Sequence, residues 1–152
     1  MSRPSATRGS EGSGLALANA AWEALLTAHT RLLRQFAAAP EWGDVTLRDY
    51  DVLYTLAKAG GPVPVGSLEQ AVLLSQPGLS RLVDRLAARG LVEKQRNPAD
   101  GRSVLVTLTD AGQAAQRRLG LAHGTHVAAA VTGQLSLAEQ ETLRQLCQKL
   151  AG

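Results

Sequence analysis

Apolar residues recur at helical spacing along most of the chain, which predicts a mainly α-helical fold. Residues 1–14 consist largely of Ser, Gly, Arg and Pro and have almost nothing to bury, so we expect a disordered tail there. A first helix follows from Leu15 through Phe36 and stops before Pro40. The pattern therefore places one long helix ahead of the other elements.

A group of shorter elements comes next and is marked by capping and turn residues. Thr46 and Asp49 have the spacing of a helix N-cap pair, and Gly60, followed by Gly and Pro, ends that helix. A short strand at 63–65 and a small helix at about 66–72 follow.

The period of the pattern then changes from that of a helix to that of a β-hairpin. A helix is expected at 76–89, with Gly90 in the position of a C-cap glycine. Two strands, at 91–96 and 103–108, flank a turn at 97–102 that is built from Asn, Pro, Asp and Gly.

Two helices close the chain. Thr109 opens a long helix that reaches about Val131, and Ser136 with Glu139 forms a capping box for a last helix through Leu150. Three glycines in the long helix either weaken this prediction or indicate close packing, namely Gly112, Gly120 and Gly124.

The order of elements predicts a winged helix-turn-helix, with three helices and a two-stranded wing at residues 46–108. The N-terminal helix at 15–45 and the C-terminal helices at 109–152 are too long and too apolar to be satisfied by so small a core. We therefore expect a mainly α fold with a small β-hairpin wing, flanked by dimerisation helices that form a homodimer.

Composition indicates the cellular compartment in which the protein is expected. The net charge of +3 and the pI of about 9.5 are compatible with a polyanionic partner. Cys147 cannot form a disulfide within the chain, and no apolar run approaches the roughly 20 residues that span a bilayer. These features favour a cytoplasmic protein with no membrane partner.

The chain lacks a convergent set of reactive groups. It has no phosphate-binding glycine loop, no G-x-S-x-G and no Cys/His arrangement. His123 and His126 are three residues apart on a helix, which could suit a metal, but a surface pair is the simpler interpretation because no cysteine or acidic cluster completes a site. We expect no enzyme, no cofactor and no metal site.

The helix at 76–89 has two contrasting faces. One face is an apolar stripe formed by Leu79, Leu82, Val83 and Leu86, and the other is small or polar, with Ser80, Arg81 and Asp84 on it and Arg85 at its flank. A helix that enters the major groove needs this division, because Ser and Gln hydrogen-bond base edges and Arg pairs with guanine. An ordinary amphipathic helix with a solvated charged face has the same pattern.

The predicted hairpin tip is cationic. Arg96 and Arg102 flank the turn, and we expect Asp100 to hold the Arg102 guanidinium through a charge-assisted hydrogen bond. A narrow minor groove attracts such an arginine. Residues 75–102 carry six cations and three carboxylates, which accounts for the whole net charge of +3. The excess positive charge therefore lies where docking on DNA requires it.

Three segments together resemble the signature of the MarR family of winged-helix transcription regulators. They are LVDRLAARGLVEK at 82–94, NPADGRS at 97–103 and VTLTDAG at 106–112. The resemblance covers about residues 75–112 and implies a homodimer on a pseudo-palindromic DNA operator, with repression as the usual outcome. The residues expected to contact double-stranded DNA are Ser75, Gln76, Ser80, Arg81, Asp84, Arg85, Arg96, Asp100, Arg102 and Ser103.

The resemblance also implies release from DNA by a small aromatic or phenolic effector, bound between the dimer helices and the DNA-binding lobe. The candidate pocket residues supply aromatic faces with a few polar groups, and are Trp22, His29, Tyr50, Asp51 and Tyr54. Plain core packing of the aromatic residues and solvation of His29 remain alternatives. Cys147 lies near the C-terminus, away from the N-terminal cysteine of peroxide-sensing relatives, so packing is its expected role.

Two other functions fit a winged helix. A module that binds protein instead of nucleic acid usually lacks a basic wing, whereas this chain has Arg96 and Arg102. An architectural DNA binder would bind every duplex with similar affinity, whereas a regulator prefers its operator by a factor of about 10³ or more.

Overall fold

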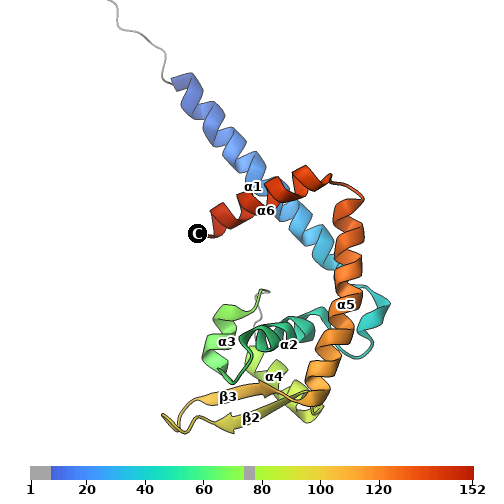
Figure 1. Ribbon diagram of the computed structural model, residues 1–152. Helices are drawn as coiled ribbons and strands as arrows, with labels where there is room; N and C mark the ends of the chain where they lie inside the picture. Colours follow the sequence, from blue (N-terminus) through green and yellow to red (C-terminus); the bar gives the residue numbers. More distant parts are fainter. Residues whose placement is uncertain (1–7, 74–77) are drawn as a thin grey trace, which may run out of the picture. The chain divides into compact units, whose positions relative to one another are not determined.

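The computed structural model of the chain describes residues 8–73 and 78–152 (Figure 1). The chain divides into two compact units, at residues 1–38 and 39–152. In the described ranges, no helix combines the length and the apolar character needed to cross a membrane.

The described part of the first unit, from residue 8 on, forms one long helix, α1 (Arg8–Ala37). It begins earlier than predicted, so the expectation of a disordered tail through residue 14 is wrong for residues 8–14, while residues 1–7 lie outside the described residues. Extending an existing helix costs far less than forming its first turn, so the helix can continue through residues of low propensity. Several of its large apolar side chains are exposed in the single chain, namely Leu15, Leu17, Trp22 and Leu26.

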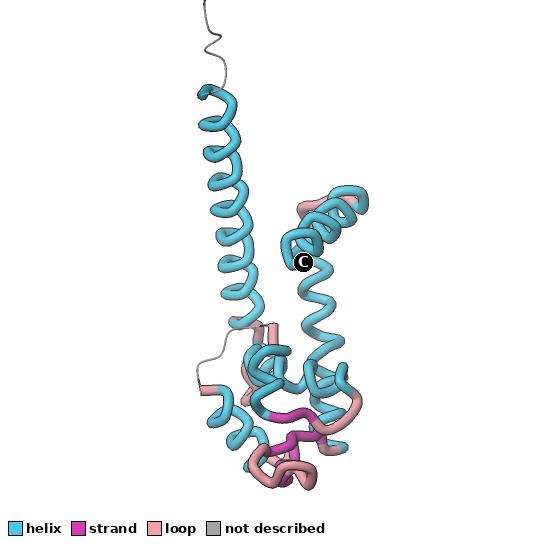
Figure 2. The backbone as a smooth tube through the Cα atoms, turned by 90° about the vertical axis from the view of Figure 1, so that its left-hand side faces the viewer, coloured by secondary structure: helices cyan, strands magenta, loops and turns pink. Residues whose placement is uncertain are grey.

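The second unit contains the winged helix-turn-helix and the two C-terminal helices. Its elements are η1 (Pro40–Trp42), α2 (Leu47–Ala59), β1 (Val63–Pro64), α3 (Val65–Ala71), α4 (Leu79–Ala88), β2 (Val92–Arg96), β3 (Val104–Leu108), α5 (Asp110–Thr132) and α6 (Leu137–Ala151). Within this unit, α5 leads from the small sheet at its first turn to α6 at its far end (Figure 2).

The predicted caps begin the helices. The Thr46 side chain accepts a hydrogen bond from the Asp49 backbone N–H at 3.1 Å, and the Asp49 carboxylate accepts one from the Thr46 N–H at 2.9 Å. Ser136 and Glu139 form the same reciprocal pair at α6, and the Thr109 hydroxyl accepts from a backbone N–H at α5. Each pair satisfies donors that have no partner inside the helix.

The hairpin is confirmed and gains a third strand. The antiparallel sheet has the order β1-β3-β2, with Val63 and Lys94 on either side of Val106. Gly101 turns the chain with a φ of 63°, which is in the region that favours glycine. The sheet places the wing beside α4.

The core of the lobe is built on the apolar stripe of α4. All four stripe residues are buried, as the sequence predicted, and they pack with side chains of α2, α3 and the sheet. Burying each such side chain is worth about 1.5–3 kcal/mol relative to leaving it exposed. The stripe therefore determines which face of α4 remains available to a partner.

One of the three α5 glycines marks a close approach. A Cβ built on Gly112 would lie 1.9 Å from the carbonyl oxygen of Leu91, whereas a Cβ on Gly120 would lie 3.0 Å from the Tyr50 hydroxyl and one on Gly124 would meet nothing within 4 Å. Of these three glycines, only Gly112 is at a position where a side chain would collide with the backbone.

We expect Gly112→Ala to lower the free energy of unfolding by about 3 kcal/mol, because overpacking against backbone cannot be relieved by a rotamer change. The matched change Gly124→Ala should leave stability unchanged or raise it by up to about 1 kcal/mol, through helix propensity. Urea denaturation of both variants measures the difference. Equal stabilities would contradict the close approach at Gly112.

Candidate nucleic-acid interface

The outer face of α4 carries the polar residues that the sequence placed there. Ser80, Arg81 and Asp84 are exposed, and the residue before α4, Gly78, has a φ of 84°. Ser75 and Gln76, which the sequence placed at the start of this helix, lie outside the described residues.

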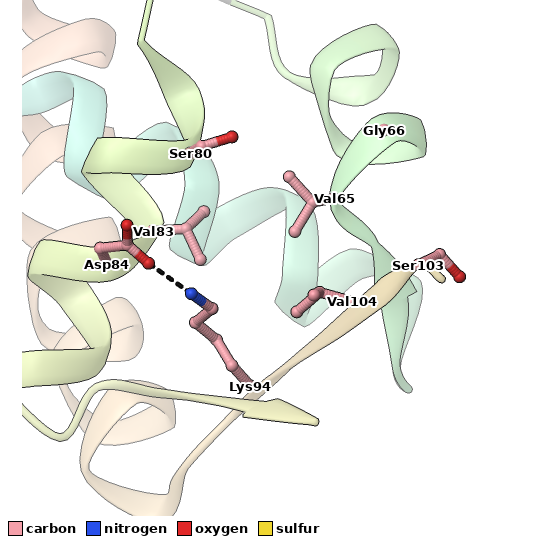
Figure 3. Close-up of a pocket in the computed structure, with 8 residues that line it drawn as sticks. All are labelled: Val65, Gly66, Ser80, Val83, Asp84, Lys94, Ser103 and Val104. Carbon is pink, nitrogen blue, oxygen red and sulfur yellow. Dashed lines mark hydrogen bonds and ion pairs between the residues drawn. The ribbon is translucent and has the colours of Figure 1, made fainter. Parts of the chain in front are cut away.

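A hollow of about 290 Å³ lies between α3, the outer face of α4 and the strands of the wing (Figure 3). Its polar lining comes from α4 and from the wing, and its apolar lining from three valines; the full set is Val65, Gly66, Ser80, Val83, Asp84, Lys94, Ser103 and Val104. The structure thus brings two predicted contact residues of α4, Ser80 and Asp84, together with a third from the wing, Ser103.

Lys94 is the one polar side chain lining this hollow that the sequence did not predict as a DNA contact. Its ammonium group reaches from β2 and makes an ion pair with the Asp84 carboxylate on α4 (Figure 3). Alternation along a strand puts Lys94 and Arg96 on one face of β2, and this spacing could have identified it. The pair offsets the negative charge that Asp84 would otherwise present to a polyanion.

The tip of the wing is organised by Asp100, but not in the way expected. Its carboxylate accepts hydrogen bonds from the backbone N–H groups of Arg102 at 3.0 Å and Ser103 at 2.9 Å, and from the Ser103 hydroxyl at 2.8 Å. The expected bond from Asp100 to the Arg102 guanidinium is therefore wrong. The turn presents its backbone donors to the carboxylate, which is a common role for Asp in turns.

Hydrogen bonds to Ser103 and Arg102 hold the pKa of Asp100 below its ordinary value, because they stabilise the charged form. The guanidinium groups of Arg96 and Arg102 make no hydrogen bond or ion pair with any residue that the structure describes. The wing is therefore a hydrogen-bonded turn with two cations available to a partner.

Arg85 does not share this availability. Its guanidinium lies 2.7 Å from the carboxylate of Asp49, whose side chain is only 1% exposed. Arg89, at the end of α4, makes a second ion pair of 2.6 Å with Asp44. Arg85 thus reaches the first turn of α2, and Arg89 reaches the loop just before that helix.

The candidate effector residues are divided between the two units of the chain, with Tyr50, Asp51 and Tyr54 in the second unit. Tyr50 is buried on α2 among aromatic rings, with ring centroids 5.5 Å from Trp42, 5.6 Å from His123 and 6.1 Å from Tyr54. Burial raises the pKa of the Tyr50 hydroxyl and lowers that of His123. This packing agrees with the alternative that Tyr50 belongs to the core.

The other candidates have different surroundings. The carboxylate of Asp51 is buried and accepts a hydrogen bond of 3.2 Å from the backbone N–H of Leu73, so it holds the chain that follows α3. Trp22 and His29 belong to α1, where both are exposed. His126, one of the two histidines considered for a metal, has its Nδ1 at 2.6 Å from a carboxylate oxygen of Glu41.

Comparison with known proteins agrees with this geometry. The sequence model of the MarR family matches residues 43–103. The chain is 33% identical over 107 residues to the multiple antibiotic resistance protein MarR of Salmonella typhimurium, which covers 70% of this chain and 74% of that protein. The MarR protein of Escherichia coli K12 matches over the same length with the same identity.

Solved structures extend the likeness beyond the lobe. A mutant of E. coli MarR complexed with operator DNA has a TM-score of 0.73 at 26% identity and covers 86% of this chain and 92% of its own. PcaV from Streptomyces coelicolor, in complex with its natural ligand, has a TM-score of 0.67 at 26% identity. The match covers 99% of this chain and 96% of the PcaV chain. With its winged helix, its sequence likeness and its structural neighbours in agreement, this chain belongs to the MarR family of transcriptional regulators.

Proposed function

We propose that this protein is a homodimer that binds a pseudo-palindromic operator, represses transcription there and is released by a small aromatic or phenolic ligand. The observation that carries the proposal is the convergence of Ser80, Asp84, Lys94 and Ser103 on one hollow between α4 and the wing. A surface of this kind, next to Arg96 and Arg102, suits the grooves of a DNA duplex.

In this proposal α4 enters the major groove. Ser80 and Arg81 contact base edges or phosphates, and Asp84 accepts a hydrogen bond from a cytosine amino group while it remains paired with Lys94. Arg102 at the wing tip enters the adjacent minor groove, where the negative potential is concentrated. The operator complex of E. coli MarR supports this mode of binding.

The dimer is proposed to form through α1, α5 and α6. None of the side chains of α6 is buried in the single chain, although Leu137, Leu143, Leu146 and Leu150 are among them. A helix with such exposed leucines gains stability by pairing with another subunit. Two-fold symmetry then places the two half-sites about 34 Å apart on the duplex.

A ligand is proposed to bind beside the aromatic cluster of α2, at Tyr50, Tyr54 and Asp51. Trp22 and His29 of α1 stay predictions from the sequence. The complex of PcaV with its natural ligand supports a ligand-responsive regulator. Repression is the proposed sign of control because it is the usual one in the family.

We expect the purified protein to bind its own upstream intergenic DNA about 10³-fold or more tightly than a scrambled duplex of equal length. Since phosphate contacts supply much of the affinity, log K should fall linearly with log salt, with a slope of about −0.9 for each phosphate neutralised. Fluorescence anisotropy at several salt concentrations measures both quantities. Equal binding to both duplexes favours an architectural role, and absence of binding favours a protein-interaction module.

The wing turn should respond to acid. Since hydrogen bonds lower the pKa of Asp100, its stabilisation of the turn is present above the ordinary carboxyl pKa of 3.8 and is lost as the pH falls through the lowered value. Ser103→Ala removes the hydroxyl donor, so the pKa of Asp100 should rise toward 3.8 in an NMR titration. Ser80→Ala is the matched control and should leave the pKa of Asp100 unchanged. If Ser103→Ala also left this pKa unchanged, the hydrogen bond from the Ser103 hydroxyl to Asp100 would be contradicted.

The dimer can be tested through one exposed leucine. Leu146 is 55% exposed on α6, and Leu146→Glu would place a charge in the proposed interface. We expect sedimentation to show a dimer for the wild type and a monomer for Leu146→Glu. Leu73→Glu changes a leucine outside the proposed interface and should remain dimeric; a wild-type monomer would exclude the homodimer.

A further inference from the structure

Two arginines at the C-terminal end of α4 bind one short segment, residues 44–49, that includes the first turn of α2. Arg85 Nη2 donates to Asp49 Oδ1 at 2.7 Å. Arg89 Nη2 pairs with Asp44 Oδ2 at 2.6 Å, and its Nη1 donates to the Asp44 backbone carbonyl at 2.9 Å. The segment 44–49 therefore contacts α4 through two arginine side chains that are one helical turn apart on α4.

Both oxygens of the Asp49 carboxylate accept hydrogen bonds. While Oδ1 accepts from Arg85, Oδ2 accepts from the backbone N–H and the hydroxyl of Thr46, both at 2.9 Å. A buried carboxylate that loses its cation is left uncompensated in a medium of low dielectric constant. The same group that caps α2 thus also fixes the direction of α4.

The segment that receives the arginines is itself fixed. Trp42 and Val45 are buried, at 5% and 3% exposure, and the Trp42 ring lies 5.5 Å from that of His123 on α5. A carboxylate oxygen of Glu41 lies 2.6 Å from Nδ1 of His126, also on α5. The arginines therefore hold α4 to a rigid part of the lobe.

Arg81 provides the contrast on the same helix. It is exposed on the outer face of α4, and in the ranges 8–73 and 78–152 its guanidinium makes no hydrogen bond or ion pair. The cations of α4 thus fall into two kinds, one available to a partner and the others bound to carboxylates of the lobe.

We propose that Arg85 and Arg89 are positioning residues, which orient α4 for operator recognition through Asp49 and Asp44 and do not neutralise DNA phosphates. The assignment rests on the proposed operator binding and removes Arg85 from the predicted DNA contacts. It also gives two acidic residues a role in binding a polyanion.

The acidic partners provide the sharpest test. Removing a carboxylate from a DNA-binding protein by itself strengthens binding, because repulsion of the phosphates falls. We nevertheless expect Asp49→Asn to bind the operator about tenfold more weakly, which is the cost of one badly placed base contact. Glu69→Gln, an exposed acid of α3 outside these pairs, is the matched control and should bind as the wild type or more tightly.

Asp44→Asn protects the test against misfolding, because the Asp44 side chain is 85% exposed and its loss does not empty the core. We expect it to weaken operator binding about threefold, with an unchanged thermal unfolding curve. If Asp49→Asn and Asp44→Asn both bind the operator as tightly as the wild type, the positioning role is overturned.

Salt dependence separates positioning from phosphate contact. Arg81→Gln should make the slope of log K against log salt shallower by about 0.9, and Arg85→Gln should keep the wild-type slope while losing operator affinity about tenfold. An equal loss of slope in both variants would make Arg85 a phosphate contact and overturn the assignment alone. Wild-type protein that binds neither the upstream fragment nor the scrambled duplex would overturn the proposed function, and this assignment with it.

Discussion

Burial of the apolar stripe of α4 is the interaction on which the rest of the lobe depends. Leu79, Leu82, Val83 and Leu86 face the core together, so the helix can rotate about its axis only by exposing leucine and valine to water. That constraint turns Ser80, Arg81 and Asp84 outward. The polar surface of the lobe is therefore a consequence of where its apolar side chains are buried.

Ion pairs and hydrogen bonds then determine which charges this polar surface presents to a partner. The carboxylates of Asp44, Asp49 and Asp84 each have a cationic partner, and that of Asp100 binds backbone amides. A polyanion approaching the outer face of α4 meets, at Asp84, a carboxylate whose charge is offset by Lys94. The arginines of α4 and the wing that make no ion pair with a described residue are Arg81, Arg96 and Arg102, and they give this surface its positive charge.

Local patterns were sufficient for most of the fold. The caps at Thr46 and Ser136, the end of α4 at Gly90 and the hairpin are each encoded within a few residues, and the structure confirms them. Contacts between distant residues could not be predicted in this way. Arg85 and Asp49 are 36 residues apart, so nothing in the local sequence distinguishes Arg85 from a DNA contact such as the one proposed for Arg81.

The errors also have physical causes. The start of α1 was placed too late because Ser and Gly have low helix propensity, which matters less once a helix has formed. Asp100 was assigned to a guanidinium because opposite charges lie close in sequence, but the backbone N–H groups of a tight turn are nearer and already oriented.

The joint between the lobe and α5 has a mechanical consequence. The Thr109 N–H donates to the Leu91 carbonyl at 3.2 Å, the Thr109 hydroxyl donates to the Gly90 carbonyl at 2.6 Å, and Gly112 packs against the same Leu91 carbonyl. Because α5 is also held farther along, where His123 packs against Trp42 and Tyr50, it turns together with the lobe. The rise of 1.5 Å per residue gives α5 a length of about 34 Å, so a rotation of the lobe by about 5° about the first turn of α5 would carry the far end of the helix through about 3 Å. Equally, a displacement imposed on the far end of α5 would rotate the lobe by a small angle.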